Sequence, residues 1–452
     1  MIELEKAGIP TVAILSHGFE HDAEATAKAF GMPGIRYAVV PKVYNNISEA
    51  EVIAQTDPVV DDLIKLLTTP ATSAETISQE VKRAGLETFS GTDQFAAWEA
   101  FNETFLERDW GDGFPLIPPT PARVEAMLQG TTRDPLDVVC MLPPGNGVAT
   151  VEKIAINCVM AGCRPAHLPI IMAAARAIAR MERRAVRGFL MSTSAHAPLM
   201  VINGPITREL GINSGRCTLG PGKMSRVNVV LGRALVLTLK NVGHWYPGIM
   251  DMDTIGTARK FSMCVAENEE HSPWEPLHVE LGFPPEASTV TIFSTGGDKD
   301  VADQGNTTAE GLLRTIAYCC IWGGAGYIAS LAGEYDDTPQ GATLVFIPPA
   351  HARPMARDGF SKKAVKDFIH AHARAPVRHL INSFNVPEKV RVQWQWLYRL
   401  SPEEQERMLL PVQETAQRYF IVCVGAPDRG KDLVFPSGSP SIEEITDRAP
   451  LG

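Results

Sequence analysis

At 452 residues the chain is long enough for two or three domains, each with its own hydrophobic core. Apolar residues make up 45% and charged residues 21%, as in an ordinary folded protein, and a formal net charge of -10 without a basic cluster argues against a nucleic-acid partner. Eight cysteines are too few for a disulfide framework, the start does not resemble a signal peptide, and no run of about 18 apolar residues could span a membrane. We therefore expect a cytoplasmic protein with reduced thiols.

The first 67 residues predict a small α/β unit. Its expected strands and helices alternate along the chain: 10–15 (strand), 22–30 (helix), 36–40 (strand) and 49–67 (helix). Such alternation favours parallel pairing of the strands. The unit looks incomplete at its start, because the sequence opens within what resembles the last turns of a helix. Residues 68–91 then predict a linker and a helix, at 74–84.

Residues 92–452 predict one main α/β domain. Its expected helices are 93–108, 120–128, 150–162, a stretch from 169 to 178, 224–239 and 308–322. Its expected strands are 198–202, 288–293, 342–347 and 419–424. The run Asp358–Ser361 should end one helix at its glycine and begin the next at its serine. The fold class that follows is α/β, with mostly parallel sheets flanked by helices.

One apolar stretch, 140–169, places a cysteine at the corner between two helices. Thr150 predicts the N-cap of the first helix and Gly162 its C-terminal stop. Cys163 follows directly, beside Arg164 and close to the start of the second helix. A cationic neighbour and a helix N-terminus both favour a thiolate, which predicts a reactive cysteine. The alternative is an inert apolar side chain that fills space between packed helices.

Polar residues and glycines follow the strand predicted at 198–202. The strand leads into Asn203 and Gly204, and further on Gly220 and Gly222 precede a helix. Backbone N–H groups at a helix start can bind an anion such as a carboxylate. The passage lacks the glycine spacing and the Ser or Thr of a Walker phosphate loop, so a plain turn is the alternative to a weak anion site.

The densest group of ionisable residues lies between positions 267 and 280. Carboxylates, an amide, two histidines and an indole occur there together: Glu267, Asn268, Glu270, His271, Trp274 and His278. Such residues can supply general acids, general bases or metal ligands, although their spacing matches no metal signature. A solvated acidic loop is the alternative.

Several short stretches resemble one family. They are Glu3–Val12, Val159–Pro165, Val201–Pro205, Ala266–Glu270 with Ser272–Trp274, and Asp358–Lys362. These motifs are similar to the UGSC family of selenoproteins and their cysteine homologues, which is itself related to the selenoprotein B component of glycine reductase. The resemblance extends over most of the chain.

The resemblance implies a thiol- or selenol-bearing enzyme that cleaves a carbon–heteroatom bond in a small molecule. The motif that names the family, Sec or Cys followed by Gly-Ser-Cys, belongs upstream of the helix at which this sequence opens. No catalytic residue is therefore carried over from that motif. Three expectations follow: the recorded start is too late, a short Cys- or Sec-containing subunit supplies the motif, or this branch works without it.

Our leading hypothesis is an enzyme that uses thiol chemistry to break a C–S, C–N or similar bond of a carboxylate-bearing substrate. Cys163 would be the nucleophile, and Glu270 or His167 would transfer protons. The residues expected to bind the substrate are Arg164, Asn203, Gly204, Gly220, Gly222, Asn268 and Trp274.

Two other hypotheses remain open. A metal-dependent lyase or hydratase would hold a divalent ion with ligands drawn from Cys163, Glu267, Glu270, His271 and His278. A non-catalytic subunit would instead depend on a partner that carries the redox-active Cys or Sec. In each case we expect a homo-oligomer, with a dimer as the default, and no contact with nucleic acid or membrane.

Overall fold

The computed structural model describes residues 85–303, 305–321, 341–383 and 387–449, and before residue 85 mainly 9–20, 36–42 and 47–69. The helices expected at 22–30 and 74–84 lie mostly outside the described residues.

The N-terminal unit has the predicted strand pairing. Strands β1 (Ala13–Ser16) and β2 (Tyr37–Val40) run parallel to each other. The helix predicted at 49–67 is divided into α3 (Glu49–Thr56) and α4 (Val60–Thr68) by a 3-10 turn, Asp57–Val59, whose central proline lacks the N–H that a continuous helix would use. Neither α3 nor α4 has a buried residue, so this unit has little core of its own among the described residues.

The main domain is built on an eight-stranded mixed sheet. The principal strand order is β12-β9-β13-β7-β5-β6, with β14 paired to β7 and β8 to β13. The strands are β5 (Ala197–Asn203), β6 (Cys264–Ala266), β7 (Thr289–Thr295), β8 (Lys299–Val301), β9 (Gly341–Ile347), β12 (Tyr419–Cys423), β13 (Asp432–Gly438) and β14 (Ser441–Glu444). The α/β class predicted from the sequence is confirmed.

Parallel pairing in this sheet is limited to β5–β6 and β9–β12. The other pairings are antiparallel. One reason is the length of the connections. Only residues 424–431 join β12 to β13, too few for a crossover helix, and β13 runs antiparallel to β9, the neighbour of β12.

The two faces of the sheet bury different residues of the same strand. In β5, Leu199 and Val201 belong to a hydrophobic cluster on one face of the sheet, together with residues of β7, β9, β12 and β13. Met200 and Ile202 point the other way and pack against helices. This alternation with a period of two is expected for a strand that is buried on both faces.

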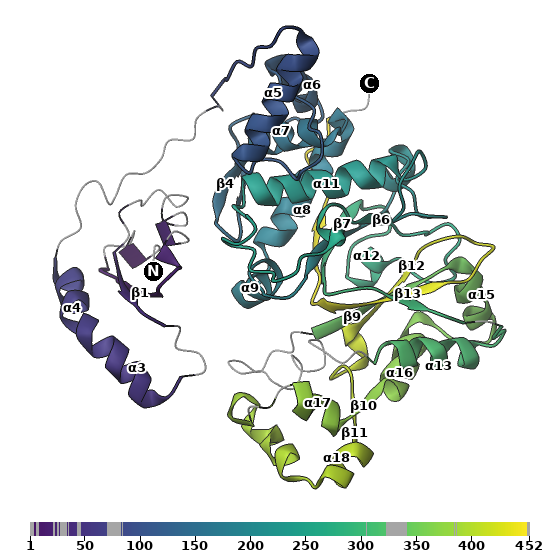
Figure 1. The fold of residues 1–452 in the computed structure, drawn as a ribbon. Helices are drawn as coiled ribbons and strands as arrows, with labels where there is room; N and C mark the ends of the chain where they lie inside the picture. The colour runs from purple at the N-terminus through teal and green to yellow at the C-terminus, as the bar shows by residue number, and fades with distance from the viewer. Residues whose placement is uncertain are drawn as a thin grey trace.

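Two groups of helices cover the face of the sheet that carries Met200 and Ile202 (Figure 1). The first comprises α7 (Val151–Ala161), α8 (Leu168–Ala179) and α11 (Arg226–Asn241), which share one cluster with β5, β6 and β7. The second comprises α13 (Ala309–Cys319), α15 (Pro349–Arg357) and α16 (Lys362–His372), which pack on β9, β12 and β13. The remaining helices are α5 (Gln94–Glu107), α6 (Pro121–Leu128), α9 (Arg183–Leu190), α10 (Ile206–Glu209), α12 (Leu277–Glu280), α17 (Val377–Ser383) and α18 (Pro402–Arg407). Two small antiparallel sheets pair β3 (Val138–Leu142) with β4 (Gly147–Thr150), and β10 (Arg374–Pro376) with β11 (Leu409–Pro411).

The predicted helix ends are confirmed where local chemistry determines them. The Thr150 hydroxyl accepts a hydrogen bond from the Lys153 amide at the start of α7, and Gly162 ends this helix at φ +88°. Ser361 caps α16 in the same way as Thr150 caps α7, through the Ala364 amide. Helix capping by nearby residues can therefore be predicted from this sequence.

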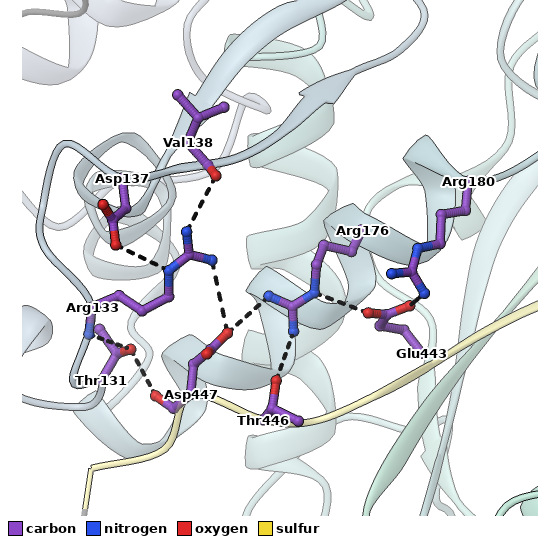
Figure 2. A network of polar contacts seen from close by, with 9 residues as sticks. All are labelled: Thr131, Arg133, Asp137, Val138, Arg176, Arg180, Glu443, Thr446 and Asp447. Atoms are coloured by element: carbon purple, nitrogen blue, oxygen red, sulfur yellow. Dashed lines mark hydrogen bonds and ion pairs between the residues drawn. The ribbon is translucent and has the colours of Figure 1, made fainter.

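The C-terminal strand is anchored to α8 by charged side chains (Figure 2). Arg176 Nε lies 3.1 Å from Glu443 Oε1, and its Nη1 lies 3.0 Å from Asp447 Oδ2. Arg180 contacts the second oxygen of Glu443, and the Thr131 hydroxyl donates to the Asp447 carbonyl at 2.7 Å. Because these groups come from residues more than 260 positions apart, the network joins the end of the described chain to the first helical layer.

In the part of the chain that is described, no single helix has the length and apolar character needed to cross a membrane. Residues 151–161 and 165–179 reach the required composition only as a pair, and they are bent by 119° relative to each other.

Candidate functional site

A cavity of about 750 Å³ lies at the carboxyl ends of β5 and β6. These strands are parallel neighbours, so the loops that follow them meet at one edge of the sheet. A third wall comes from the segment 211–224. Polar and acidic residues dominate the lining, including Asn213, Ser214, Glu267, Asn268, Glu269 and Glu270. We call this space the β5–β6 cavity.

Two carboxylates of the cavity share one amide donor. Asn203 Nδ2 lies 2.6 Å from Glu267 Oε2 and 3.0 Å from Glu269 Oε1. The backbone N–H of Gly204 donates to the same oxygen of Glu269 at 2.7 Å. Asn203 is fully buried beneath the lining, and its Oδ1 has no partner among the described residues. The predicted residues Asn203 and Gly204 thus orient carboxylates through their N–H groups.

Glu267 is held in the protein interior by further donors. Its Oε2 also accepts the backbone N–H of Leu277, the first residue of α12, at 2.7 Å, and its Oε1 lies 3.4 Å from the Cys423 amide. Burial raises the pKa of Glu267, opposed in part by the positive charge of Lys362. Lys362 is itself 5% exposed, lies 2.9 Å from Glu280 Oε2, and has its pKa lowered by burial. A buried carboxyl with a raised pKa can hold a proton closer to neutral pH than a solvated one.

Asn268 links the end of β6 to the end of β12 by hydrogen bonds. Its backbone N–H donates to the Cys423 carbonyl at 2.7 Å, and its Nδ2 donates to the Gly425 carbonyl at 3.2 Å. These contacts join the residues after β6 and β12, the two ends of the principal strand order. Its Oδ1 lies 3.0 Å from His271 Nδ1, which keeps that histidine on the loop. Asn268 therefore lines the cavity while serving as a structural tie.

Glu270 and Arg208 face each other at the mouth of the cavity. Their charged groups are 3.9 Å apart and both side chains are largely exposed, so the pair contributes little stability. The lining contains three glutamates and the guanidinium of Arg208. The field inside the cavity therefore favours cationic or hydrogen-bond-donating groups.

Trp274, Gly220 and Gly222 do not line the β5–β6 cavity. The Trp274 indole donates to the Phe360 carbonyl at 3.0 Å and packs with the α13–α16 cluster. The Gly220 amide is used within its own turn by the Cys217 carbonyl, at 2.8 Å, which matches the plain-turn alternative.

Sequence reasoning did not select Glu269, Asn213 or Ser214, which all line the cavity. Glu269 lies within the acidic run at 267–280, and no local pattern distinguishes it there from Glu267 and Glu270. Asn213 and Ser214 lie eleven and ten positions before Met224 in the glycine-rich passage, and only its glycines were considered.

Cys163 lies elsewhere, at the C-terminal end of α7. It is partly buried against the α7–α8–α11 cluster and does not line the cavity. As a thiol it can donate to the Val230 carbonyl of α11, with a sulfur–oxygen distance of 3.5 Å. A hydrogen bond from Cys158, with support from His167 and Arg233, lowers the pKa of Cys163 to about 6.

His167 and Arg164 belong to this second location. The backbone N–H of Arg164 donates to His167 Nδ1 at 3.1 Å, so the proton of the neutral ring sits on Nε2. His167 is buried, whereas Arg164 is exposed. The structure therefore groups Cys163 with His167 and separates both from Glu270, the alternative proton carrier.

The predicted metal ligands Glu267, His271 and His278 are not assembled into a site. No group of three or more His, Cys, Asp or Glu side chains within the described ranges is placed to hold a metal ion. Both oxygens of Glu267 face protein donors, His271 faces Asn268, and the Nε2 of the buried His278 lies 3.4 Å from the Pro285 carbonyl. Each of these groups is directed to its own neighbour and not to a common centre.

Comparison with known proteins gives one match. Residues 1–69 match the model of the UGSC family, which confirms the predicted family resemblance for this segment. No curated protein and no solved structure matches the chain.

Proposed function

We propose that this chain, whose first 69 residues match the UGSC family, is an enzyme that breaks a carbon–heteroatom bond of a small molecule bound in the β5–β6 cavity. The observation that supports this most directly is the pair Glu267 and Glu269. Both line the cavity and both accept from Asn203 Nδ2, yet Glu267 is 3% exposed and Glu269 is partly open to solvent. Two adjacent carboxyl groups in different surroundings are suited to opposite proton-transfer roles.

The roles follow from burial. Glu267, with its raised pKa, would hold a proton and give it to the leaving nitrogen, oxygen or sulfur atom. Glu269, oriented by Gly204 and Asn203, would accept a proton from the substrate or from an attacking water. Asn203 acts as a positioning residue, because it fixes the distance between the two carboxylates.

The substrate class follows from the charge of the lining. With Glu267 protonated, a small amine would place its ammonium group beside Glu269 and Glu270, whose two charges outnumber the single guanidinium of Arg208. A carboxylate would be repelled unless it reached Arg208 at the mouth. The carboxylate-bearing substrate expected from the sequence is therefore restricted to molecules that also carry an amine.

Ligand binding tests the proposal without knowledge of the reaction. Small primary amines, amino acids and simple carboxylates would be screened by thermal shift, and stabilising compounds would be measured by calorimetry with the wild-type chain, E269Q and E403Q. Glu403 forms an exposed ion pair with Arg407 on α18 and serves as a matched surface control. We expect stabilisation by amine-bearing compounds, at least a tenfold loss of affinity in E269Q and none in E403Q. Binding by simple carboxylates alone, or equal affinity in all three proteins, would contradict the proposal.

A further inference from the structure

The end of α7 brings two cysteines together through a backbone motif. Gly162, at φ +88°, donates its N–H to the Val159 carbonyl at 3.0 Å, and Cys163 donates its N–H to the Cys158 carbonyl at 2.9 Å. These two bonds define a Schellman motif, in which the side chain after the glycine contacts the side chain five positions before it. In this chain both of those side chains are cysteines. The spacing differs from Cys-x-x-Cys, yet the motif brings Cys158 and Cys163 together across the helix end, joined by the backbone bond from Cys163 N–H to the Cys158 carbonyl.

The two thiols differ in access and in ionisation. Cys158 has no exposed surface, and burial raises its pKa. Cys163 is partly exposed, and the nearby His167 and Arg233 favour its thiolate. A reachable thiolate beside a protonated buried thiol is the arrangement of an attacking and a resolving cysteine.

A hollow of about 510 Å³ shares Ile117 with the end of α7. Phe95, Trp98, Ile117 and Arg123 contribute to its walls. Ile117 is also packed against Gly162, since a Cβ built on that glycine would lie 3.4 Å from Ile117 Cδ1. An aromatic hollow with one guanidinium suits a small anionic molecule that presents apolar or sulfur-containing parts to the rings.

We propose that Cys158 and Cys163 form a redox-active pair that exchanges with small anionic disulfides bound at the Trp98–Arg123 hollow. The Cys163 thiolate attacks one sulfur of R–S–S–R, forming Cys163–S–S–R and releasing RS⁻. The Cys158 sulfur then attacks Cys163 Sγ, the second RS⁻ leaves, and the proton of Cys158 passes to a released thiolate. Two electrons move from the protein to the small molecule, so one disulfide breaks and one forms. Because the backbone bond from Cys163 N–H to the Cys158 carbonyl already holds the two residues side by side, we expect closure by rotation of the side chains.

Oxidised glutathione is a suitable probe, since it is a small anionic disulfide. The full chain would be equilibrated in buffers of increasing oxidised-to-reduced glutathione ratio, free thiols blocked with N-ethylmaleimide, and the tryptic peptide 154–176 analysed by mass spectrometry. This peptide contains Cys158 and Cys163 and no other cysteine. We expect complete loss of label at both positions in oxidising buffer and full recovery after dithiothreitol. Cys319 and Cys320, adjacent in the sequence, should remain reduced.

The variant C158S sharpens the assignment of roles. Without a resolving thiol, Cys163 should accumulate as a mixed disulfide with glutathione, and R123A should slow its formation by roughly threefold or more through loss of the anion contact. The wild-type peptide map shows whether Cys158 and Cys163 are oxidised together, even if a variant is unstable. Persistent labelling of both cysteines while exposed Cys217 becomes oxidised would overturn the proposal, as would a C158S chain whose Cys163 stays free. The result does not depend on ligands of the β5–β6 cavity, so the two proposals can fail separately.

Discussion

The β5–β6 cavity and the Cys158–Cys163 pair are assembled in opposite ways. In the cavity, Asn203 and Glu267 meet although 64 residues separate them in the chain. The cysteine pair is closed within six residues by one helix end. Non-local sites of the first kind depend on the register of the sheet, whereas the second kind needs only a helix and a glycine. The two regions should therefore respond differently to substitutions that disturb tertiary packing.

The largest effect is expected from G204A at the cavity. Gly204 has φ +87°, and a Cβ there would lie 2.1 Å from the Ala287 carbonyl oxygen. The left-handed backbone and the clash together should cost about 2–5 kcal/mol of unfolding free energy. Chemical denaturation measures this, with G211A as the matched control, because Gly211 also has positive φ but open space around its Cα. Equal losses in the two variants would refute the role assigned to packing at Gly204.

G162A should cost less, about 1–2 kcal/mol, because the left-handed backbone is strained but the new Cβ meets only ordinary contacts. Its informative effect is on the thiols. Weakening the Schellman motif should separate Cys163 from Cys158 and slow alkylation of Cys163 near pH 7, as measured by timed iodoacetamide labelling. Unchanged labelling with reduced stability would show that the motif does not control the thiolate.

The buried carboxyl of Glu267 predicts that the unfolding free energy depends on pH. Because burial raises the pKa of Glu267, the folded protein binds this proton more tightly than the unfolded chain. The contribution to stability is complete below the unfolded pKa of about 4.3 and is lost as the pH rises through the folded pKa. The unfolding free energy of the wild type relative to E267Q should therefore decrease as the pH rises above about 4, in denaturation curves recorded from acid to neutral pH. If the unfolding free energy of the wild type relative to E267Q increased with pH, the pKa of Glu267 would be lowered and not raised by folding.

The smallest change in stability is expected for H167N, which alters ionisation at the cysteine pair. An asparagine Oδ1 can still accept the Arg164 amide that His167 Nδ1 accepts now. Loss of the histidine's contact with the sulfur should move the midpoint of Cys163 alkylation upward from about pH 6. Cys217, which is exposed, supplies the internal standard, and its labelling profile should not move. An unaltered midpoint would remove His167 from this site.

Much of the architecture could be predicted from local patterns. The expected strand at 198–202 is β5, the expected helix at 224–239 is α11, and the turn at 358–361 separates α15 from α16. The antiparallel strands of the main sheet could not be predicted, because strand direction depends on how short connections are routed and not on composition. Of the predicted site residues, the structure brings Asn203 and Gly204 into hydrogen-bond contact with Glu267 and Glu269 of the acidic loop, whereas Cys163 lies elsewhere.

By itself the sequence determined where helices start and stop and which residues alternate between two buried faces. It also determined that Cys158 and Cys163 lie on either side of the glycine that ends α7, at the spacing that a Schellman motif brings together. These features depend on hydrogen bonds and contacts between residues a few positions apart. Only the tertiary structure decided which carboxylates share a cavity, that the Trp274 indole donates to the Phe360 carbonyl, and that the histidines of the acidic loop face separate neighbours. Contacts of that kind arise when distant strands are brought into register, and no local pattern in the chain encodes the resulting distances.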